Sequence, residues 1–252
     1  MELTLKGKVA LVTGTASQIG MGKAIALTLA REGCDIIAND IDLAGAEKTG
    51  AEIKALGSKV LVYKADITRS SEVNDMVKAG IKELGRIDIL VNNAGGGDRG
   101  GILSMDEAKR DRCIDLNLKG AMNCAKAVLP DMISRKWGRI VSTASHAAIM
   151  GHPSGFAYAA SKAGIIGFTK SIALEMGQHG ITVNAIIPGM VLTNLTIKDM
   201  TPERIEATRE RLPLRRICTV QDAANMVLFL VSDLASYVTG QAVFVDGGAL
   251  MR

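Results

Sequence analysis

The chain has 252 residues, a formal net charge of +4, and 48% hydrophobic but only 3% aromatic residues. This length suits one α/β domain with an aliphatic core, and the mild, scattered charge argues against nucleic acid as a partner. No apolar run approaches the roughly 18 residues of a membrane span, and residues 1–6 lack the apolar region of a signal peptide, so we expect a cytoplasmic protein without membrane contact.

Short apolar runs, rich in β-branched residues, alternate along the chain with longer helical patterns. Strands are predicted over residues 8–12, 35–38, 60–63, 87–91, 139–142, 181–186 and 242–245. Helices are predicted over residues 22–31, 43–56, 70–84, 106–134, 157–176 and 219–232, with Ser70 as the cap of the third. Because such alternation is typical of a parallel sheet covered on both faces, we expect a doubly wound α/β sheet of about seven strands, a Rossmann fold.

No linker or internal repeat divides the chain, so residues 1–252 are predicted to form a single domain. Segment 190–217, between a strand and a helix, is the least regular part. Its charged stretch, residues 201–211, could form a small helix over a site. We therefore predict that segment 190–217 is a mobile substrate lid.

The first predicted strand runs into a glycine-rich turn, residues 13–22 with the sequence TGTASQIGMG, and then into a helix. Glycines let the backbone turn tightly and approach a pyrophosphate at the N-terminus of a helix. Many βα turns contain glycine, but the first βα unit is the context in which such a turn binds a dinucleotide. The candidate cofactor residues in this turn are Gly14, Ser17, Gln18, Gly20 and Met21.

The second predicted strand ends at Asn39 and Asp40, about twenty positions beyond the glycines. An acidic side chain at this place hydrogen-bonds the adenosine ribose hydroxyls and repels a 2′-phosphate, and no arginine follows nearby to receive one. The predicted cofactor is therefore NAD, with NADP less favoured. In the alternative interpretation, Asp40 is only a turn residue and Asp42 caps the next helix.

A tyrosine and a lysine lie four residues apart in Tyr158-Ala-Ala-Ser-Lys162, with Ser145 thirteen residues upstream. Positions i and i+4 share one face of a helix, so the lysine charge can lie beside the phenol and lower its pKa from about 10 toward neutrality. The serine hydroxyl could hold a carbonyl or carbinol oxygen in the same place. This set suits proton transfer to oxygen coupled to hydride transfer at carbon, although an exposed lysine beside a half-buried ring also occurs by chance.

The cysteines and histidines show no pattern of a metal or disulfide site. The four cysteines (Cys34, Cys113, Cys124 and Cys218) are scattered without a C-x-x-C pair, and the three histidines lack metal-binding spacing. Buried, reduced thiols in a cytoplasmic protein, and no metal, are the interpretation that this pattern favours.

Together these segments resemble the short-chain dehydrogenase/reductase family over essentially the whole chain. The motifs arrive in the family's order: the glycine turn, Asp66 after the third strand, Asn92-Asn93-Ala94-Gly95, Asn117, Ser145, Tyr158 with Lys162, Pro188-Gly189 with Thr193, and the closing Thr239-Gly240 and Val245-Asp246-Gly247-Gly248. The resemblance implies an oxidoreductase that acts on CH–OH groups with a nicotinamide dinucleotide. The family is usually tetrameric, so a homotetramer or homodimer is also implied.

The resemblance implies a role for each matching residue. Tyr158 would be the general acid/base, Ser145 would orient the substrate oxygen, and Lys162 would bind the nicotinamide ribose and lower the pKa of the tyrosine. Asn117 would hold a water that relays protons through Lys162. The remaining cofactor contacts would be Asp66 and Ile67 at the adenine, Asn93, Ala94 and Gly95 at the adenosine ribose, and Val191 and Thr193 at the carboxamide, with Pro188 and Gly189 in the same set.

The glycine turn departs from the family pattern, because it is two residues longer than the usual T-G-x-x-x-G-I-G. Its spacing looks like that of the divergent enoyl-thioester reductases, which place the tyrosine and the lysine further apart. The spacing of Tyr158 and Lys162 therefore favours carbonyl–alcohol chemistry, and the contacts of Ser17, Gln18 and Ile19 stay open.

The chain is similar to 3-oxoacyl-acyl-carrier-protein reductases near both ends. The two arginines with which those enzymes dock their acidic partner match Pro130 and Leu174 here, and neither can bind an acidic helix. Another basic patch could be formed by Arg135, Lys136, Lys109 and Arg110, although a solvated charged surface is the commoner explanation.

Residues 92–98 and 188–224 also resemble bacterial hydroxysteroid and sugar dehydrogenases, and Asp40 fits an enzyme that oxidises with NAD. We therefore predict an NAD-linked secondary-alcohol dehydrogenase acting on a small molecule. The alternative is a 3-oxoacyl-thioester reductase, on acyl carrier protein or CoA, that uses NADPH or NADH. A non-catalytic dinucleotide-sensing regulator is a remote alternative, because such a protein would lose Tyr158 or Lys162.

The substrate pocket is expected where family members shape it, between Ser145 and Tyr158. Its candidate residues are His146, Met150, His152 and Phe156. His152 could bind a polar substrate group, and an exposed loop histidine is an equally good explanation. Arg99, in a glycine-rich stretch, could bind a carboxylate or be only surface charge.

Overall fold

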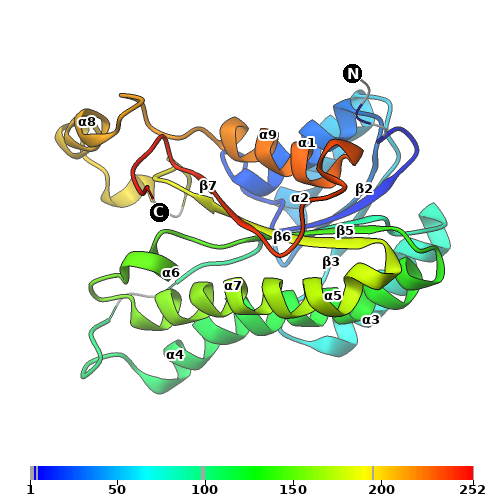
Figure 1. Cartoon of the computed structure of the whole chain (residues 1–252), viewed down its shortest axis with the longest axis horizontal. Helices are drawn as coiled ribbons and strands as arrows, with labels where there is room; N and C mark the ends of the chain where they lie inside the picture. Colours follow the sequence, from blue (N-terminus) through cyan, green and yellow to red (C-terminus); the bar gives the residue numbers. More distant parts are fainter. Residues whose placement is uncertain (1–2, 4, 98–99, 195, 252) are drawn as a thin grey trace.

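The computed structural model of the protein describes residues 3, 5–97, 100–194 and 196–251. In this part of the chain, a parallel sheet of seven strands has the order β3-β2-β1-β4-β5-β6-β7 (Figure 1). The strands are β1 (Val9–Thr13), β2 (Asp35–Asp40), β3 (Val60–Lys64), β4 (Ile89–Asn92), β5 (Gly138–Thr143), β6 (Ile181–Pro188) and β7 (Ala242–Val245). The predicted α/β domain with a doubly wound parallel sheet is confirmed.

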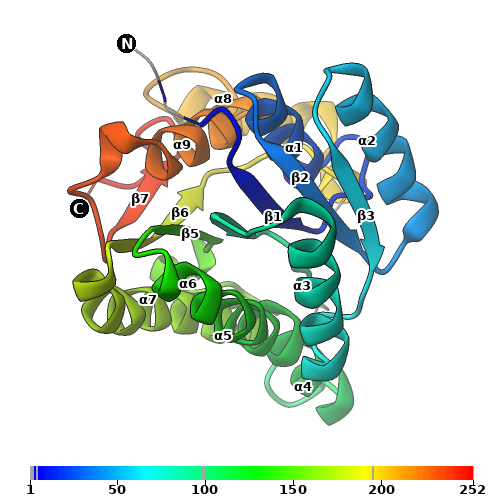
Figure 2. The same ribbon diagram turned by 90° about the vertical axis from the view of Figure 1, so that its right-hand side faces the viewer.

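Helices cover both faces of the sheet, as Figure 2 shows. One layer consists of α1 (Met21–Arg31), α2 (Leu43–Ala55) and α9 (Val220–Val231), and the other of α3 (Ser70–Leu84), α5 (Gly120–Ser134) and α7 (Phe156–Met176). Shorter elements are α4 (Glu107–Ile114), the π-helical turn η1 (Asp115–Lys119), α6 (Ala147–Met150), α8 (Pro202–Arg211), and the 3₁₀ turns η2 (Gly177–His179), η3 (Ile197–Asp199) and η4 (Asp233–Ala235). The two layers bury the sheet on both sides, which explains why its strands are almost entirely apolar.

The strand order reverses at β1, which pairs with β2 on one side and with β4 on the other. In open parallel sheets, ligands bind in the crevice beyond the carboxyl ends of the strands at this reversal. The glycine turn that follows Thr13 and the segment that follows Asn92 flank this crevice. The topology therefore brings together two of the stretches that the sequence selects as cofactor-binding.

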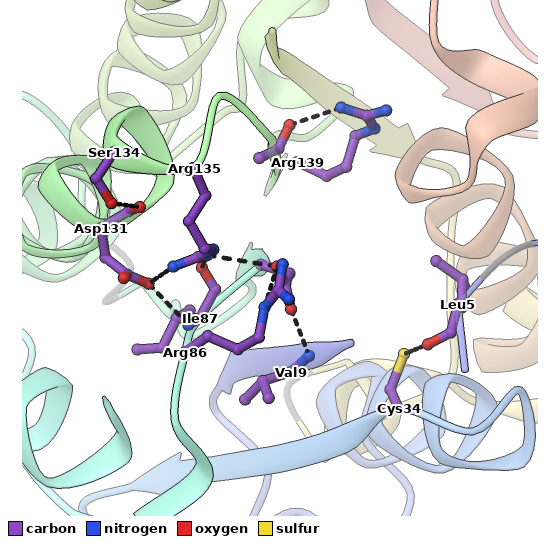
Figure 3. Close-up of polar contacts among 11 residues, drawn as sticks. Leu5, Val9, Cys34, Arg86, Ile87, Asp131, Ser134, Arg135 and Arg139 are labelled. Carbon is purple, nitrogen blue, oxygen red and sulfur yellow. Dashed lines mark hydrogen bonds and ion pairs between the residues drawn. The ribbon is translucent and has the colours of Figure 1, made fainter. Parts of the chain in front are cut away.

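A buried carboxylate, that of Asp88, ties the amino ends of two strands together. Its oxygens accept hydrogen bonds from Val9 N at 2.9 Å, from Arg86 Nε at 2.8 Å and from Arg135 Nη2 at 3.3 Å. Figure 3 shows the two arginine side chains converging beside Val9. A buried charge of this kind is tolerated because it is paired and hydrogen-bonded, and the loss of one partner would leave it only partly compensated.

Arg135 is accordingly committed to the interior of the fold. Its guanidinium also donates to the Ile87 carbonyl at 2.8 Å and pairs with Asp131 on the same helix (Figure 3). Arg135 therefore does not join Lys136 in a basic surface patch, and the alternative of a solvated charge is equally wrong for it. Sequence patterns could not reveal this, because Asp88 lies 47 residues away.

Several helical elements differ from the sequence prediction. The helix predicted over residues 106–134 is interrupted by η1, a single π-helical turn that carries Asn117. Such turns are rare and are frequently found at functional sites. Ser70 is the first residue of α3 and not its cap, since the N-cap position is held by Arg69 without a side-chain hydrogen bond. The short helix α6 was not predicted, because four residues are too few to show a periodic pattern.

Among the described residues, no helix is long and apolar enough to cross a membrane. The same residues contain no group of three or more His, Cys, Asp or Glu side chains that could hold a metal ion. None of the four cysteines forms a disulfide, and Cys218 is the one that is only half-buried. Burial raises the pKa of the Cys34 and Cys124 thiols to about 12, which keeps both protonated and unreactive.

Candidate active site

The start of the glycine turn lies against the end of β4. Gly14 has a φ of +75°, and a Cβ at this position would come within 2.8 Å of Ala94 Cα. The Asn93 side chain donates to the carbonyls of Thr13 at 3.0 Å and Gly14 at 3.2 Å. Only glycine fits this backbone without strain, and Asn93 holds the turn open toward the crevice.

The rest of the turn, including the two extra residues, is anchored to α2. The Gln18 amide donates to the carbonyls of Ala16 at 2.8 Å and Gly45 at 3.1 Å, and its oxygen accepts from Lys23 Nζ at 2.9 Å. Lys23 is in turn paired with Glu52 of α2 at 2.6 Å. The Gln18 side chain therefore points to α2 and is not among the cavity-lining groups, in contrast to its predicted cofactor contact.

A cavity of about 830 Å³ opens beyond the carboxyl ends of β1, β2 and β4. It is lined by most of the predicted cofactor residues: Gly14, Ser17, Gly20, Met21, Asp40, Asp66, Ile67, Asn93, Ala94, Gly95 and Thr193. Other lining residues, among them Thr68, Arg112 and Leu116, were not predicted, because nothing in the local sequence marks them. A long cavity that begins at a glycine cradle and ends in acidic and apolar groups fits a dinucleotide.

Asp40 accepts backbone hydrogen bonds and also lines this cavity. Its Oδ2 accepts from Ala16 N at 2.9 Å and its Oδ1 from Asp42 N at 3.1 Å. Asp42 caps α2 by accepting from Gly45 N at 3.1 Å. Each carboxylate oxygen of Asp40 retains a further lone pair for the cavity, so the two interpretations of this residue do not exclude each other.

Asp66, two residues after the end of β3, lines the same cavity. Its Oδ1 accepts from the backbone N and the hydroxyl of Thr68, at 2.9 and 2.8 Å. Burial by itself would raise the pKa of Asp66, but these hydrogen bonds, together with the nearby Arg69 and Arg112, hold the pKa below its ordinary value. The carboxylate is therefore charged at neutral pH and acts only as an acceptor.

A second cavity of about 500 Å³ adjoins the first through Met21 and Thr193. It is lined by Ser145, His146, Met150, His152, Tyr158, Pro188, Gly189 and Val191, all of which were predicted site residues. Phe156 is not among the lining residues; it lies half-buried at the start of α7. The described residues that line this cavity include no Asp, Glu, Lys or Arg. Arg99 lies outside the described residues.

Ser145 and Tyr158 line the second cavity, and the buried Lys162 lies beside Tyr158 without lining either cavity. The Ser145 hydroxyl hydrogen-bonds Tyr158, but burial outweighs this bond and raises the pKa of Tyr158. Lys162 Nζ lies 5.7 Å from the centre of the tyrosine ring and donates to the Thr143 carbonyl at 2.6 Å. Burial lowers the pKa of Lys162 from 10.5 to about 8. The expected lowering of the tyrosine pKa by Lys162 is therefore not produced by the protein alone.

Asn117 lies beside this group and is buried. Its Oδ1 accepts from Gly96 N at 3.2 Å, and its Nδ2 donates to Gly96 O at 2.5 Å and Cys113 O at 2.8 Å. A Cβ at Gly95 would come within 2.6 Å of Asn117 Oδ1 and 3.3 Å of Lys162 Nζ. The π-helical turn thus brings Asn117 to the lysine, where its side chain holds the loop after β4.

Segment 190–217 contributes part of the wall of the second cavity. Its predicted small helix is α8, capped by Thr201, and Thr208 and Leu212 contribute to the cavity lining. Close to β6, the Thr196 hydroxyl donates to Val191 O at 2.5 Å and accepts from Thr193 N at 3.0 Å. The predicted carboxamide residues are thereby held in one turn at the junction of the cavities.

Comparisons with known proteins agree with this geometry. A family model described as enoyl-(acyl carrier protein) reductase matches residues 14–249. The 3-oxoacyl-acyl-carrier-protein reductase FabG of Thermotoga maritima is 41% identical over 250 residues, which cover 99% of this chain and all of that protein. The hydroxy(phenyl)methylsuccinyl-CoA dehydrogenase subunit BbsD of Thauera aromatica is 42% identical over 245 residues, 97% of each chain. A solved structure from Sinorhizobium meliloti 1021, described provisionally as a short-chain alcohol dehydrogenase, has 34% identity and a TM-score of 0.93 and covers 99% of this chain and 98% of its own.

Proposed function

Because this chain belongs to the short-chain dehydrogenase/reductase family, and is thus an oxidoreductase acting on CH–OH groups with a nicotinamide dinucleotide, we propose that it interconverts a 3-hydroxyacyl and a 3-oxoacyl thioester with NAD(H). The observation that carries the proposal is the placement of Ser145 and Tyr158 in the wall of a smaller uncharged cavity that adjoins a dinucleotide-sized one, with the buried Lys162 beside the tyrosine. A bound nicotinamide dinucleotide supplies the hydride acceptor or donor. The residues of the chain supply binding, orientation and proton transfer.

In this proposal, the reacting oxygen of the substrate lies between the Ser145 and Tyr158 hydroxyls. Tyr158 gives a proton to that oxygen in reduction and takes it in oxidation, and Ser145 fixes the oxygen by a hydrogen bond. Lys162, with Asn117 beside it, stabilises the charge that appears on the tyrosine. Segment 190–217, as a lid, excludes water while the reaction proceeds.

The thioester class is supported by the names of the relatives, since 3-oxoacyl and hydroxy(phenyl)methylsuccinyl-CoA groups both place the reacting carbon next to the α-carbon of a thioester. An acyl carrier protein is disfavoured as the carrier. Pro130 is exposed and apolar, and Leu174 is 86% exposed, at the places where carrier-docking arginines were expected. Arg135 is committed to Asp88 and Asp131. A CoA thioester is therefore the substrate that we propose.

The choice of NAD over NADP rests on Asp40. Its carboxylate lines the larger cavity at the end of β2 and would repel a 2′-phosphate. We further propose a homodimer or homotetramer, because α5 and α7 present Met122 and Leu174 as exposed apolar side chains on one layer. Sedimentation or light scattering would measure that state directly.

The decisive experiment measures oxidation of NADH and NADPH with acetoacetyl-CoA, followed by nicotinamide absorbance, with a panel of cyclic alcohols, hydroxysteroids and polyols in the reverse direction. Tyr158→Phe is expected to abolish turnover and leave the NADH dissociation constant nearly unchanged. Tyr237→Phe, on a fully exposed tyrosine, is the matched control. Retained activity in Tyr158→Phe, or turnover of the alcohols alone, would contradict the proposal; the second outcome would favour the secondary-alcohol dehydrogenase.

A further inference from the structure

The wall of the smaller cavity contains a histidine–aspartate pair that the proposed reaction does not yet use. His146 Nε2 lies 3.0 Å from Asp246 Oδ2, and the two side chains are 23% and 5% exposed. Because a carboxylate only accepts, Nε2 carries the hydrogen and donates it to Asp246. The imidazole also packs against the ring of Phe244, with 6.2 Å between ring centres. The His146 ring is therefore fixed from two sides.

Asp246 connects this histidine to the turn that follows β7. Its Oδ1 accepts from Gly248 N at 3.0 Å and its Oδ2 from Leu250 N at 2.9 Å, in addition to the bond from His146. The same turn reaches the end of the lid segment, where Leu214 N donates to Gly247 O at 3.2 Å. One buried carboxylate thus links the C-terminal turn, and through it the lid segment, to the wall of the smaller cavity.

His146 is the neighbour of Ser145 in the chain and is the N-cap of helix α6. The Ser145 hydroxyl accepts from Ala147 N at 3.2 Å and hydrogen-bonds Tyr158. The place of that hydroxyl is consequently set by where the first turn of α6 lies. The side-chain bond from His146 to Asp246 holds this turn against the C-terminal turn.

We propose that His146 is a positioning residue: through Asp246 it fixes the turn that carries Ser145 and couples the serine hydroxyl to the C-terminal turn and the lid segment. The inference rests on the proposed function, since Ser145 must hold the substrate oxygen for its position to matter. Small errors in such a position are costly in rate, because a displacement of roughly 1 Å can lower turnover about a hundredfold.

The test compares His146→Leu, which removes the donor, with His146→Gln, whose amide N–H can reach Asp246. Turnover of acetoacetyl-CoA with NADH is measured together with NADH affinity and with the isotope effect of deuterated NADH. We expect His146→Leu to lower kcat by about tenfold or more, with NADH affinity unchanged and a larger isotope effect, because hydride transfer then limits the rate. His146→Gln should restore most of kcat. His179→Leu is the matched control, because His179 lies just before the amino end of β6, whereas the second cavity lies at the carboxyl end of this strand.

A second measurement examines the pair as a unit. If His146 acts through Asp246, the effects of His146→Leu and Asp246→Asn on kcat are strongly non-additive. Additive effects, a glutamine variant as impaired as the leucine variant, or a leucine variant with unchanged kcat and isotope effect would each overturn the proposal. If the wild type turns over a secondary alcohol and not acetoacetyl-CoA, the proposed function fails, and the same comparison is made with that alcohol.

Discussion

Replacement of Lys162 by methionine should remove a cost in folding free energy that is present at neutral pH and fades as the pH rises. Lys162 Nζ is buried, and burial lowers its pKa from 10.5 to about 8. The native state therefore binds this proton less tightly than the unfolded chain does. Below pH 8 the charged lysine costs folding free energy, and above pH 10.5 that cost is gone.

The size of the effect follows from the shift in pKa. Each unit corresponds to about 1.4 kcal/mol, so the full shift of Lys162 corresponds to about 3 kcal/mol of unfolding free energy. Between pH 7 and pH 10, about 2.5 kcal/mol of this cost disappears from the unfolding free energy of the wild type. Lys162→Met has no titrating group at this position, so its unfolding free energy lacks this pH-dependent contribution. The methionine variant also leaves the Thr143 carbonyl without its donor, but that loss does not depend on pH and cancels in the comparison.

Urea unfolding followed by Trp137 fluorescence, at several values between pH 7 and pH 10, gives the free energy of unfolding for both proteins. The variant-minus-wild-type difference should fall by about 2.5 kcal/mol over this range. Lys170→Met removes a charge from the exposed face of the same helix and is the matched control. A difference for Lys162→Met that does not change with pH would refute the reasoning, because Lys162 would then not be a buried cation at neutral pH.

Three further predictions concern the cofactor preference, the contribution of Arg135 to stability, and the pH profile of the reaction. Asp40→Asn should reduce the preference for NADH over NADPH by about tenfold, since it removes the charge that repels a 2′-phosphate. Titration with both cofactors measures the ratio of their dissociation constants. An unchanged ratio would show that Asp40 does not select the cofactor. Arg135→Glu should cost about 3–5 kcal/mol of unfolding free energy, because it removes one of the two guanidinium partners of Asp88 and adds a carboxylate beside Asp88 and Asp131, whereas the exposed Lys136→Glu should change it by less than about 0.5 kcal/mol. Equal stability of the two variants would show that Arg135 acts only as a surface charge. Because the pKa of Tyr158 is raised above its ordinary value of about 10, reduction should stay constant from neutral pH to about pH 10 and fall only when the tyrosine loses its proton, while oxidation should rise with pH; parallel profiles in the two directions would contradict the role of this residue.

The order of the strands and helices was predictable because it is written in local patterns. The last strand was predicted with the bounds that the structure shows, Ala242–Val245. The helix ends that coincide with glycines in the left-handed conformation, such as Gly85, were also predicted, since few other residues adopt that backbone. The comparisons place the chain in the family that its motifs indicated.

The parts that were not predictable depend on contacts between distant segments. Gln18 turns to Gly45, 27 residues away, and so leaves the cavity that its place in the glycine turn suggests. The π-helical turn at Asn117 follows from the packing of the buried amide against Gly96 and Cys113, which no helical period encodes. The ionisation of Tyr158 depends on burial, a quantity that the spacing of two residues cannot supply.

Burial acts on the two titrating groups of the site in opposite directions, and this decides what the protein can do by itself. It raises the pKa of Tyr158 and lowers that of Lys162, because in each case it disfavours the charged form. At pH 7 Tyr158 is therefore protonated, and Lys162 is still charged in most molecules. The site then holds a proton donor beside a cation. The fold alone is thus prepared to protonate the oxygen of a ketone as it is reduced. The tyrosinate that oxidation needs requires further positive charge in the larger cavity, so the balance between the two directions should depend on the cofactor form that occupies it.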